Sequence, residues 1–183
     1  MREVIGGPFG YDYESTHNSA LSQNLKKNLF VSGRSAFLHS VNYMFNKKKI
    51  NEIEIPCYLC ESIINTLKIN KIKYSLYKID KNFNLSPKLK KNTLTLLINY
   101  FSLNLGNIEE IKNSYPGHNF LEDATHSILN DNFSFAAKND CDYFFSLRKV
   151  SPVFAGGSSV SNNVKEISQN LKKFLKEDLK TKI

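Results

Sequence analysis

The stretch that decides the fold is residues 142–157, DYFFSLRKVSPVFAGG, which has the composition of a buried strand that ends abruptly in polar residues. The uncharged aromatic run YFF favours a strand. Ser146 follows it directly, and Lys149 lies three residues further on. A desolvated lysine amine has a lowered pKa and can attack a carbonyl carbon to form a Schiff base. The alternative is a strand followed by an ordinary basic surface turn.

Length and composition predict one domain, because the chain has 183 residues and 41% of them are hydrophobic. We expect an N-terminal arm over residues 1–19, an α/β domain over 20–157, and a linker with an amphipathic helix over 158–183. No apolar run approaches the roughly 20 residues that span a bilayer. The first residues lack the apolar segment of a secretory signal, and three cysteines without an evident disulfide framework favour a reducing cytoplasm.

The net charge of +8 raises nucleic acid as a partner. Only Arg2, Arg34 and Arg148 are arginines, and the lysines are scattered among asparagine and isoleucine. Nucleic-acid readers use arginine forks and interleaved aromatic residues, and neither is clustered here. The sequence therefore predicts no nucleic-acid partner. An arginine fork at Arg34 or Arg148 suits a phosphate or carboxylate ligand, or equally a structural ion pair.

Strands and helices are expected to alternate along the chain. The expected strands are 53–56, 74–80, 93–101, 120–123 and 142–146, and the expected helices are 33–45, 62–69 and 108–115. This pattern predicts an α/β fold with a mainly parallel sheet flanked by helices. Ligands of such sheets bind beyond the carboxyl ends of the strands. The residues at those ends are Asn99 and Tyr100, Asp123, and Ser146 to Lys149.

The segment Gly33-Arg34-Ser35-Ala36 opens one of the expected helices. A glycine and a hydroxyl at a helix N-terminus favour phosphate, because free N–H groups and the positive end of the helix dipole meet there. The simpler interpretation is that Ser35 caps the helix.

Cys57 and Cys60 form a C-x-x-C segment just before a helix, as in thioredoxin-like redox sites. There is no second such pair, and Cys141 and the four histidines do not match a standard zinc spacing, so no metal site is predicted. Buried, inert cysteines are the favoured interpretation.

Taken together, the motifs GRSA, PCYLCES, INYF, LEDATHS and SLRK followed by GG resemble the large domain of fold-type-I pyridoxal-phosphate (PLP) enzymes, in particular the DegT-like sugar aminotransferases. The resemblance covers residues 5–157 and implies PLP as the cofactor. It also implies a keto sugar nucleotide and an amino-acid donor as substrates, a homodimer, and a role in surface polysaccharide biosynthesis.

The resemblance assigns the chemistry to three residues. Lys149 matches the lysine that forms the Schiff base with PLP and later acts as the general base. Asp123 matches the aspartate that pairs with the pyridine nitrogen. His126 takes the position of a glutamine near the ring hydroxyl. Some relatives carry histidine in place of the lysine and act as dehydratases, so Lys149 favours transamination.

The resemblance also assigns the residues that surround the cofactor. Those expected to bind its phosphate are Gly33, Arg34, Ser35, Ala36 and Ser146. Either Tyr58 or Cys60 takes the position of the aromatic residue that stacks on the ring. The family's remaining large-domain segment and small domain do not follow Gly157, which leaves a truncated or degenerate, non-catalytic member as the main alternative. A thioredoxin-like oxidoreductase is the lesser one.

Overall fold

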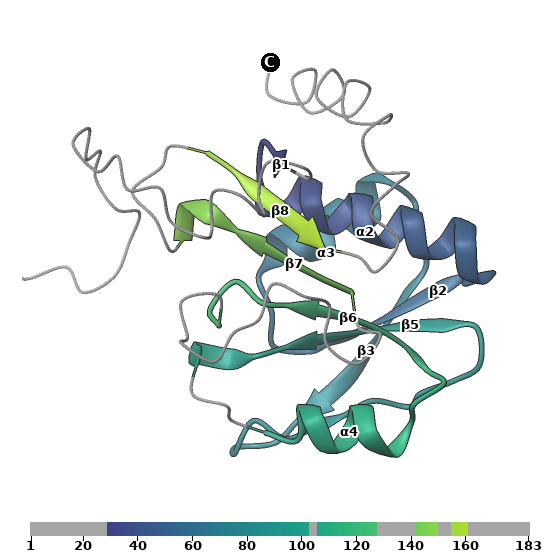
Figure 1. Cartoon of the computed structure of the whole chain (residues 1–183). Helices are drawn as coiled ribbons and strands as arrows, with labels where there is room; N and C mark the ends of the chain where they lie inside the picture. Colours follow the sequence, from purple (N-terminus) through teal and green to yellow (C-terminus); the bar gives the residue numbers. More distant parts are fainter. Residues whose placement is uncertain (1–28, 103–105, 128–141, 150–154, 161–183) are drawn as a thin grey trace, which may run out of the picture.

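The computed structural model describes residues 29–102, 106–127, 142–149 and 155–160, which form a sheet flanked by helices (Figure 1). The strand order is β1-β8-β7-β6-β5-β2-β3-β4. The strands are β1 (Leu29–Phe30), β2 (Glu52–Pro56), β3 (Tyr74–Ile79), β4 (Leu85–Ser86), β5 (Thr93–Ile98), β6 (Asn119–Asp123), β7 (Asp142–Ser146) and β8 (Gly157–Val160). The helices are α2 (Gly33–Lys48), α3 (Glu61–Ile69) and α4 (Ile108–Ser114), with single 3₁₀ turns η1 (Tyr100–Ser102) and η2 (Leu147–Lys149). The expected N-terminal arm and C-terminal helix lie outside the described residues.

The centre of the sheet is parallel, which confirms the predicted α/β fold. Strands β3, β2, β5, β6 and β7 pair in parallel in that spatial order. All six residues of β5 are buried, as its continuous hydrophobicity predicted. The prediction was wrong at the end of this strand, because β5 stops at Ile98 and the chain turns into η1.

The sheet extends further than the sequence indicated. The expected linker began at residue 158, but β8 inserts between β7 and β1 and pairs antiparallel with both. Ser158 and Ser159 are buried in this strand, and their hydroxyl groups have no hydrogen-bond partner among the residues that the structure describes. A serine-rich segment lacks the alternating apolar pattern that identifies strands, so the pattern predicted a linker instead.

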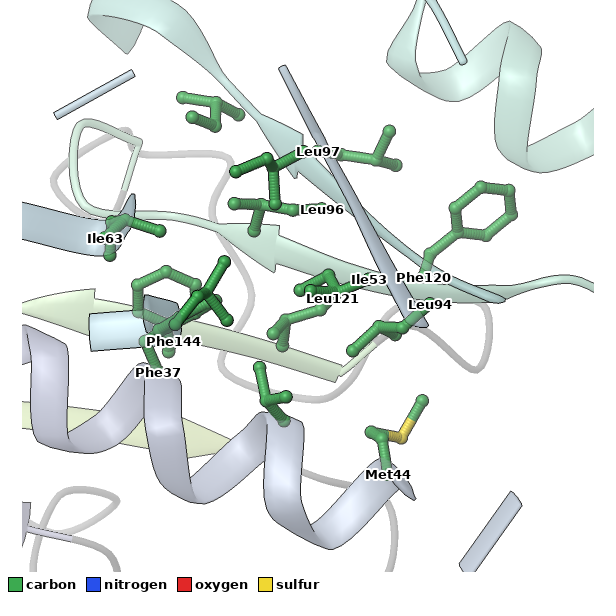
Figure 2. Close-up of a cluster of buried hydrophobic side chains, with 14 of the residues drawn as sticks. Phe37, Met44, Ile53, Ile63, Leu94, Leu96, Leu97, Phe120, Leu121 and Phe144 are labelled. Atoms are coloured by element: carbon green, nitrogen blue, oxygen red, sulfur yellow. The ribbon is translucent and has the colours of Figure 1, made fainter. Parts of the chain in front are cut away.

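The hydrophobic core lies mainly between the sheet and α2 (Figure 2). Phe37, Val41 and Met44 repeat at helical spacing along α2 and are buried. The Phe37 ring packs on Phe144 of β7, with centroids 5.2 Å apart. Leu121 of β6 is also fully buried in this cluster. The packing of α2 fixes where its N-terminus meets the sheet.

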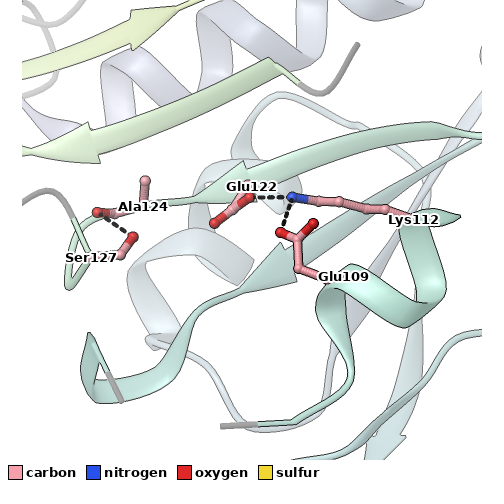
Figure 3. A network of polar contacts seen from close by, with 5 residues as sticks. All are labelled: Glu109, Lys112, Glu122, Ala124 and Ser127. Carbon is pink, nitrogen blue, oxygen red and sulfur yellow. Dashed lines mark hydrogen bonds and ion pairs between the residues drawn. The ribbon is translucent and has the colours of Figure 1, made fainter. Parts of the chain in front are cut away.

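The opposite face of the sheet is joined to α4 by a buried charge network (Figure 3). The Nζ atom of Lys112 in α4 lies 2.6 Å from Oε2 of Glu122 in β6 and 3.5 Å from Oε1 of Glu109. Successive residues of a strand point to opposite faces, so Glu122 and Asp123 face opposite ways. Asp123 is in register with Phe144, which packs on α2. Helices α2 and α4 therefore cover opposite faces of the sheet.

Removing the Lys112 amine is expected to destabilise the protein. The side chain of Lys112 is only 5% exposed and that of Glu122 16%, so Lys112→Ala leaves a poorly hydrated carboxylate without its cation. We expect a loss of about 3 kcal/mol in the free energy of unfolding. Urea denaturation measures it, with the exposed Lys68→Ala as the matched control. A double change, Lys112→Met with Glu122→Leu, should recover part of the loss. Equal losses in the two alanine variants would contradict this interpretation.

Candidate functional site

The carboxyl ends of β5, β6 and β7 lie side by side at one edge of the sheet. Asp123 is in register with Ile98 on one side and Phe144 on the other. The residues that follow these strand ends therefore share this edge, where α/β sheets bind their ligands. The sequence prediction that Asn99, Asp123 and Ser146 meet here agrees with the register.

The N-terminus of α2 lies against Ser146, at the end of β7. A Cβ atom on Gly33 would come within 2.7 Å of the Ser146 Cβ atom and 3.3 Å of its Oγ atom, so only glycine permits this approach. The helix is capped by Ser32 and not by Ser35: Ser32 Oγ accepts the Ser35 N–H at 3.2 Å. The turn at residues 33–36 is thus held beside Ser146 by its cap.

Asp123 is held in place from both neighbouring strand ends. Its Oδ1 atom accepts the Thr125 N–H at 3.0 Å, and the Thr125 hydroxyl accepts the Ser146 N–H at 3.2 Å. The residue keeps some exposure, but protein atoms closely surround the carboxyl group, and this desolvation raises its pKa. The Thr125 hydrogen bonds and the charges of His126 and Lys149 act in the opposite direction.

An aromatic cluster lies beside Asp123. It consists of the rings of Tyr58, Phe83, Tyr100 and Phe101, with neighbouring centroids 5.2–6.3 Å apart. Tyr100 is buried and donates its hydroxyl hydrogen to the Tyr58 carbonyl, which ties the loop after β2 to the end of β5. Tyr58 and Phe101 are 60% and 48% exposed, so they form the open side of the cluster.

His126 is oriented by Phe101. The Phe101 N–H donates to His126 Nδ1 at 3.2 Å, and the two rings stack with an interplanar angle of 13°. Because Nδ1 accepts a hydrogen bond, the proton of the neutral ring resides on Nε2. The neutral ring of His126 therefore presents a single N–H donor, Nε2–H, at this edge, and the charged form of His126 lowers the pKa of Asp123.

The basic side chains that the sequence singled out are exposed at the same edge. Lys149 follows β7 within η2, and Arg34 is in the first turn of α2. The pKa of the Cys60 thiol is lowered mainly by its hydrogen bond with Ser62. The charges of Lys149 and Arg34 lower this pKa further. Cys57 and Cys60 are exposed, so the prediction that these cysteines are buried was wrong.

The structure thus brings most of the predicted site residues to one edge, and it adds others. Thr125, Phe83 and Phe101 were not predicted. Thr125 lies within the LEDATHS motif, and only its hydroxyl could have indicated a role. Phe83 is a single aromatic residue in a polar loop, and nothing local indicates that it packs on Tyr58. Within the described ranges, no group of three or more His, Cys, Asp or Glu side chains could hold a metal ion.

This topology occurs in solved structures with which the chain shares little sequence. The E. coli GDP-4-keto-6-deoxy-D-mannose-3-dehydratase with bound hydrated PLP matches with a TM-score of 0.60 and 19% identity over 86% of this chain. The Helicobacter pylori aminotransferase PseC, involved in pseudoaminic acid biosynthesis, matches with a TM-score of 0.61 and 20% identity over 84%. The chain has the fold of the large domain of fold-type-I PLP enzymes.

A third structure of this PLP fold is the sugar aminotransferase CalS13 from Micromonospora echinospora, with a TM-score of 0.61 and 10% identity over 85% of this chain. The chain spans 45–47% of the length of these three proteins. No protein-family model matches the chain, and no curated protein matches it in sequence. None of the helices in the described part of the chain is long and apolar enough to cross a membrane.

Adding one methyl group at Gly33 is expected to displace α2 from Ser146. The new methyl group would meet the backbone and the short side chain of Ser146, which cannot move aside as the end of a long side chain can. Gly33→Ala should therefore lower the free energy of unfolding by about 1–3 kcal/mol. Gly117→Ala is the matched control, since a Cβ atom there meets nothing within 4 Å. Urea denaturation of both variants measures the difference. A loss at Gly33 no larger than at Gly117 would show that the approach does not constrain the site.

Neutralising Asp123 is expected to stabilise the ligand-free protein. Desolvation raises its folded-state pKa above the unfolded value of about 3.9. Ionisation in the folded state is therefore unfavourable relative to the unfolded chain at pH 7, and this penalty disappears as the pH falls through the folded pKa and then below the unfolded one. Asp123→Asn should raise the urea midpoint at pH 7, and its advantage should shrink in acid.

Asp80 provides the control of opposite sign. Its carboxylate accepts hydrogen bonds from Asn84 and Asn82, which lower its pKa. The resulting stabilisation is present above the unfolded pKa and is lost as the pH falls through the folded one. Asp80→Asn should therefore lower the urea midpoint at pH 7. If Asp123→Asn behaves in the same way as Asp80→Asn, the carboxyl of Asp123 is not desolvated.

Proposed function

We propose that this domain binds PLP through Lys149 and uses it to transfer an amino group from an amino acid to a keto sugar nucleotide. The observation that carries the proposal is the arrangement at the ends of β6 and β7. There a desolvated carboxyl (Asp123) and an amine (Lys149) whose charge acts on it share the sheet edge with a hydroxyl (Ser146) that lies against the start of α2. This combination suits a ligand that has a planar cationic ring for the carboxyl, an aldehyde for the amine and a phosphate group for the hydroxyl.

The residues present fit such a ligand. Asp123 forms no ion pair within the described residues, although desolvation makes its ionised form costly. A protonated pyridine nitrogen would supply the missing cation and favour the carboxylate. The Asn99 Oδ1 atom at the end of β5 is also buried and has no hydrogen-bond partner within the described residues. Both observations indicate an edge prepared for a polar ligand.

The phosphate would lie at the start of α2. The helix dipole and the N–H groups of its first turn favour an anion there. Ser146 Oγ lies close to Gly33, and the exposed Arg34 adds a positive charge, while Ser35 and Ala36 complete the turn. The absence of a side chain at Gly33 keeps the helix start and the strand end together, so one group can contact both.

The catalytic roles follow from the positions of three side chains. PLP, when bound, supplies an electron sink for charge that develops on the donor's α-carbon. The Asp123 carboxylate would hold the protonated ring nitrogen, and the His126 Nε2–H would be available to a ring oxygen. Lys149 would hold the cofactor through its Nζ atom and, when free, would move a proton as a general base. The exposed ring of Tyr58 would be available to stack on the cofactor ring.

Several further assignments belong to the same proposal. The solved structures of this fold include sugar aminotransferases and a keto-sugar dehydratase, which supports a keto sugar nucleotide as the acceptor. A lysine at position 149 favours transamination over dehydration. We propose that the protein acts in the cytoplasm as a homodimer of the DegT-like kind, in surface polysaccharide biosynthesis.

Covalent capture of the cofactor provides the first test. Purified protein with added PLP should develop the visible absorption band of a Schiff base, and borohydride reduction should place a stable adduct on Lys149. Lys149→Ala should abolish both signals, because Lys149 is the lysine of the η2 turn that directly follows the strand end with Ser146. The exposed Lys68→Ala is the control and should retain the band. Adducts spread over many lysines in both variants would overturn the proposal.

Turnover provides the second test and separates the main alternative, a non-catalytic member of the same fold. Glutamate and a keto sugar nucleotide are added to the loaded protein, and the amino sugar is measured over many equivalents. Sustained production supports the aminotransferase. A Lys149 adduct without any amino sugar would favour a module that binds the cofactor and has no turnover.

A further inference from the structure

Cys57 and Cys60 lie at the candidate site but have no part in the proposed reaction. β2 ends at Pro56, and α3 begins at Glu61, so the two cysteines occupy the short connection between them. Both are exposed, and the backbone bends repeatedly from Cys57 to Leu59. Two cysteines separated by two residues in a bent connection are spaced as in the C-x-x-C motifs that form disulfides.

The surroundings of Cys60 make it the more reactive thiol. Its Sγ atom lies 3.1 Å from the Ser62 hydroxyl, at the N-cap of the nine-residue helix α3. Hydrogen bonding by Ser62 lowers its pKa most, and the charges of Lys149 and Arg34 lower it further. A thiolate at a helix N-terminus near basic side chains is a better nucleophile than an ordinary thiol at neutral pH.

We propose that Cys57 and Cys60 form a reversible disulfide that regulates the site, with Cys60 as the attacking thiolate. The oxidant is a small-molecule disulfide such as oxidised glutathione. Cys60 attacks one of its sulfurs, a mixed disulfide forms, and one thiolate leaves. Cys57 loses its proton and attacks the Cys60 sulfur, and the second thiolate leaves. Two protein thiols are oxidised to one disulfide, and one small-molecule disulfide is reduced to two thiols.

Closing this disulfide would act on the aromatic cluster, because Tyr58 lies between the two cysteines. The Tyr58 carbonyl accepts the hydrogen bond from Tyr100, and its ring packs on Tyr100 and Phe83. A disulfide constrains this segment and with it the exposed Tyr58 ring, which the proposed function places beside the cofactor. The oxidised form should therefore bind PLP more weakly, and this consequence rests on the proposed function.

The arrangement differs from that expected of a general thiol oxidoreductase. The more reactive thiol is the second cysteine of the pair, and the helix begins only after it. The pair also borders Arg34 and Lys149, which the proposed function assigns to the cofactor. The position of the pair favours regulation of this site.

The experiment counts thiols in the whole protein after titration of the reduced form with oxidised glutathione. Two of the three thiols should disappear, and dithiothreitol should restore them. Both cysteines lie in one tryptic peptide, residues 50–68, which should become lighter by the two lost hydrogens. Cys57→Ser should accumulate glutathione on Cys60. Cys60→Ser should lose the fast reaction, and Cys141→Ser, as the control, should still lose two thiols.

Three outcomes would overturn the proposal. The first is a disulfide that includes Cys141, and the second is no loss of thiols in the folded protein. The third is a disulfide between Cys57 and Cys60 that leaves the PLP affinity of the oxidised protein equal to that of the reduced one. If the reduced protein binds no PLP, the proposed function fails and the regulatory consequence fails with it, while the thiol count still decides whether the disulfide forms.

Discussion

The candidate site depends on the close approach of Gly33 to Ser146. The core packing of Phe37 against Phe144 draws α2 onto the sheet, and the missing side chain at Gly33 lets the helix start touch the end of β7. β8 approaches the start of α2 in the same way. A Cβ atom on Gly157, the first residue of β8, would collide with the Ser32 carbonyl oxygen, so this position also requires glycine. Helix, strand end and returning strand therefore meet with backbones in contact, and the position of the anion-favouring helix terminus follows from sterics.

At the same edge, the surroundings of the Asp123 carboxyl are unfavourable for it when no ligand is bound. Asp123 sits where hydration is poor, yet the Thr125 N–H and nearby positive charges favour its ionised form. These opposing effects give a carboxyl whose protonation responds strongly to a nearby cation. On the far face, Glu122, one residue earlier, is neutralised directly by Lys112. Two adjacent carboxyls of one strand thus serve different purposes. Glu122 joins a helix to the sheet, whereas Asp123 has no ion pair within the described part of the chain.

Much of this arrangement could be predicted because it follows from strand order and hydrophobic patterns. The buried run of β5 and the polar residues after β6 and β7 were sufficient to predict a parallel sheet with a site at one edge. Features that depend on contacts between distant segments were not predicted. The serines of β8 carry no strand pattern, and the ends of β5 and α2 depend on the η1 turn and on the Ser32 cap. The exposure of Cys57 and Cys60 depends on how the connection after β2 leaves the sheet.

Phe83 and Phe101 share an unusual backbone, with φ values of 63° and 58° in the left-handed region. A residue with a side chain is disfavoured there by about 1–2 kcal/mol relative to ordinary helical geometry, and glycine is the residue that avoids this cost. Both positions instead carry large aromatic rings, which meet edge to face at 5.4 Å next to the site. The molecule thus gives up conformational stability at two loop positions in exchange for a rigid aromatic surface. Selection for stability alone would replace these residues, whereas selection for a rigid aromatic wall beside the site would retain them.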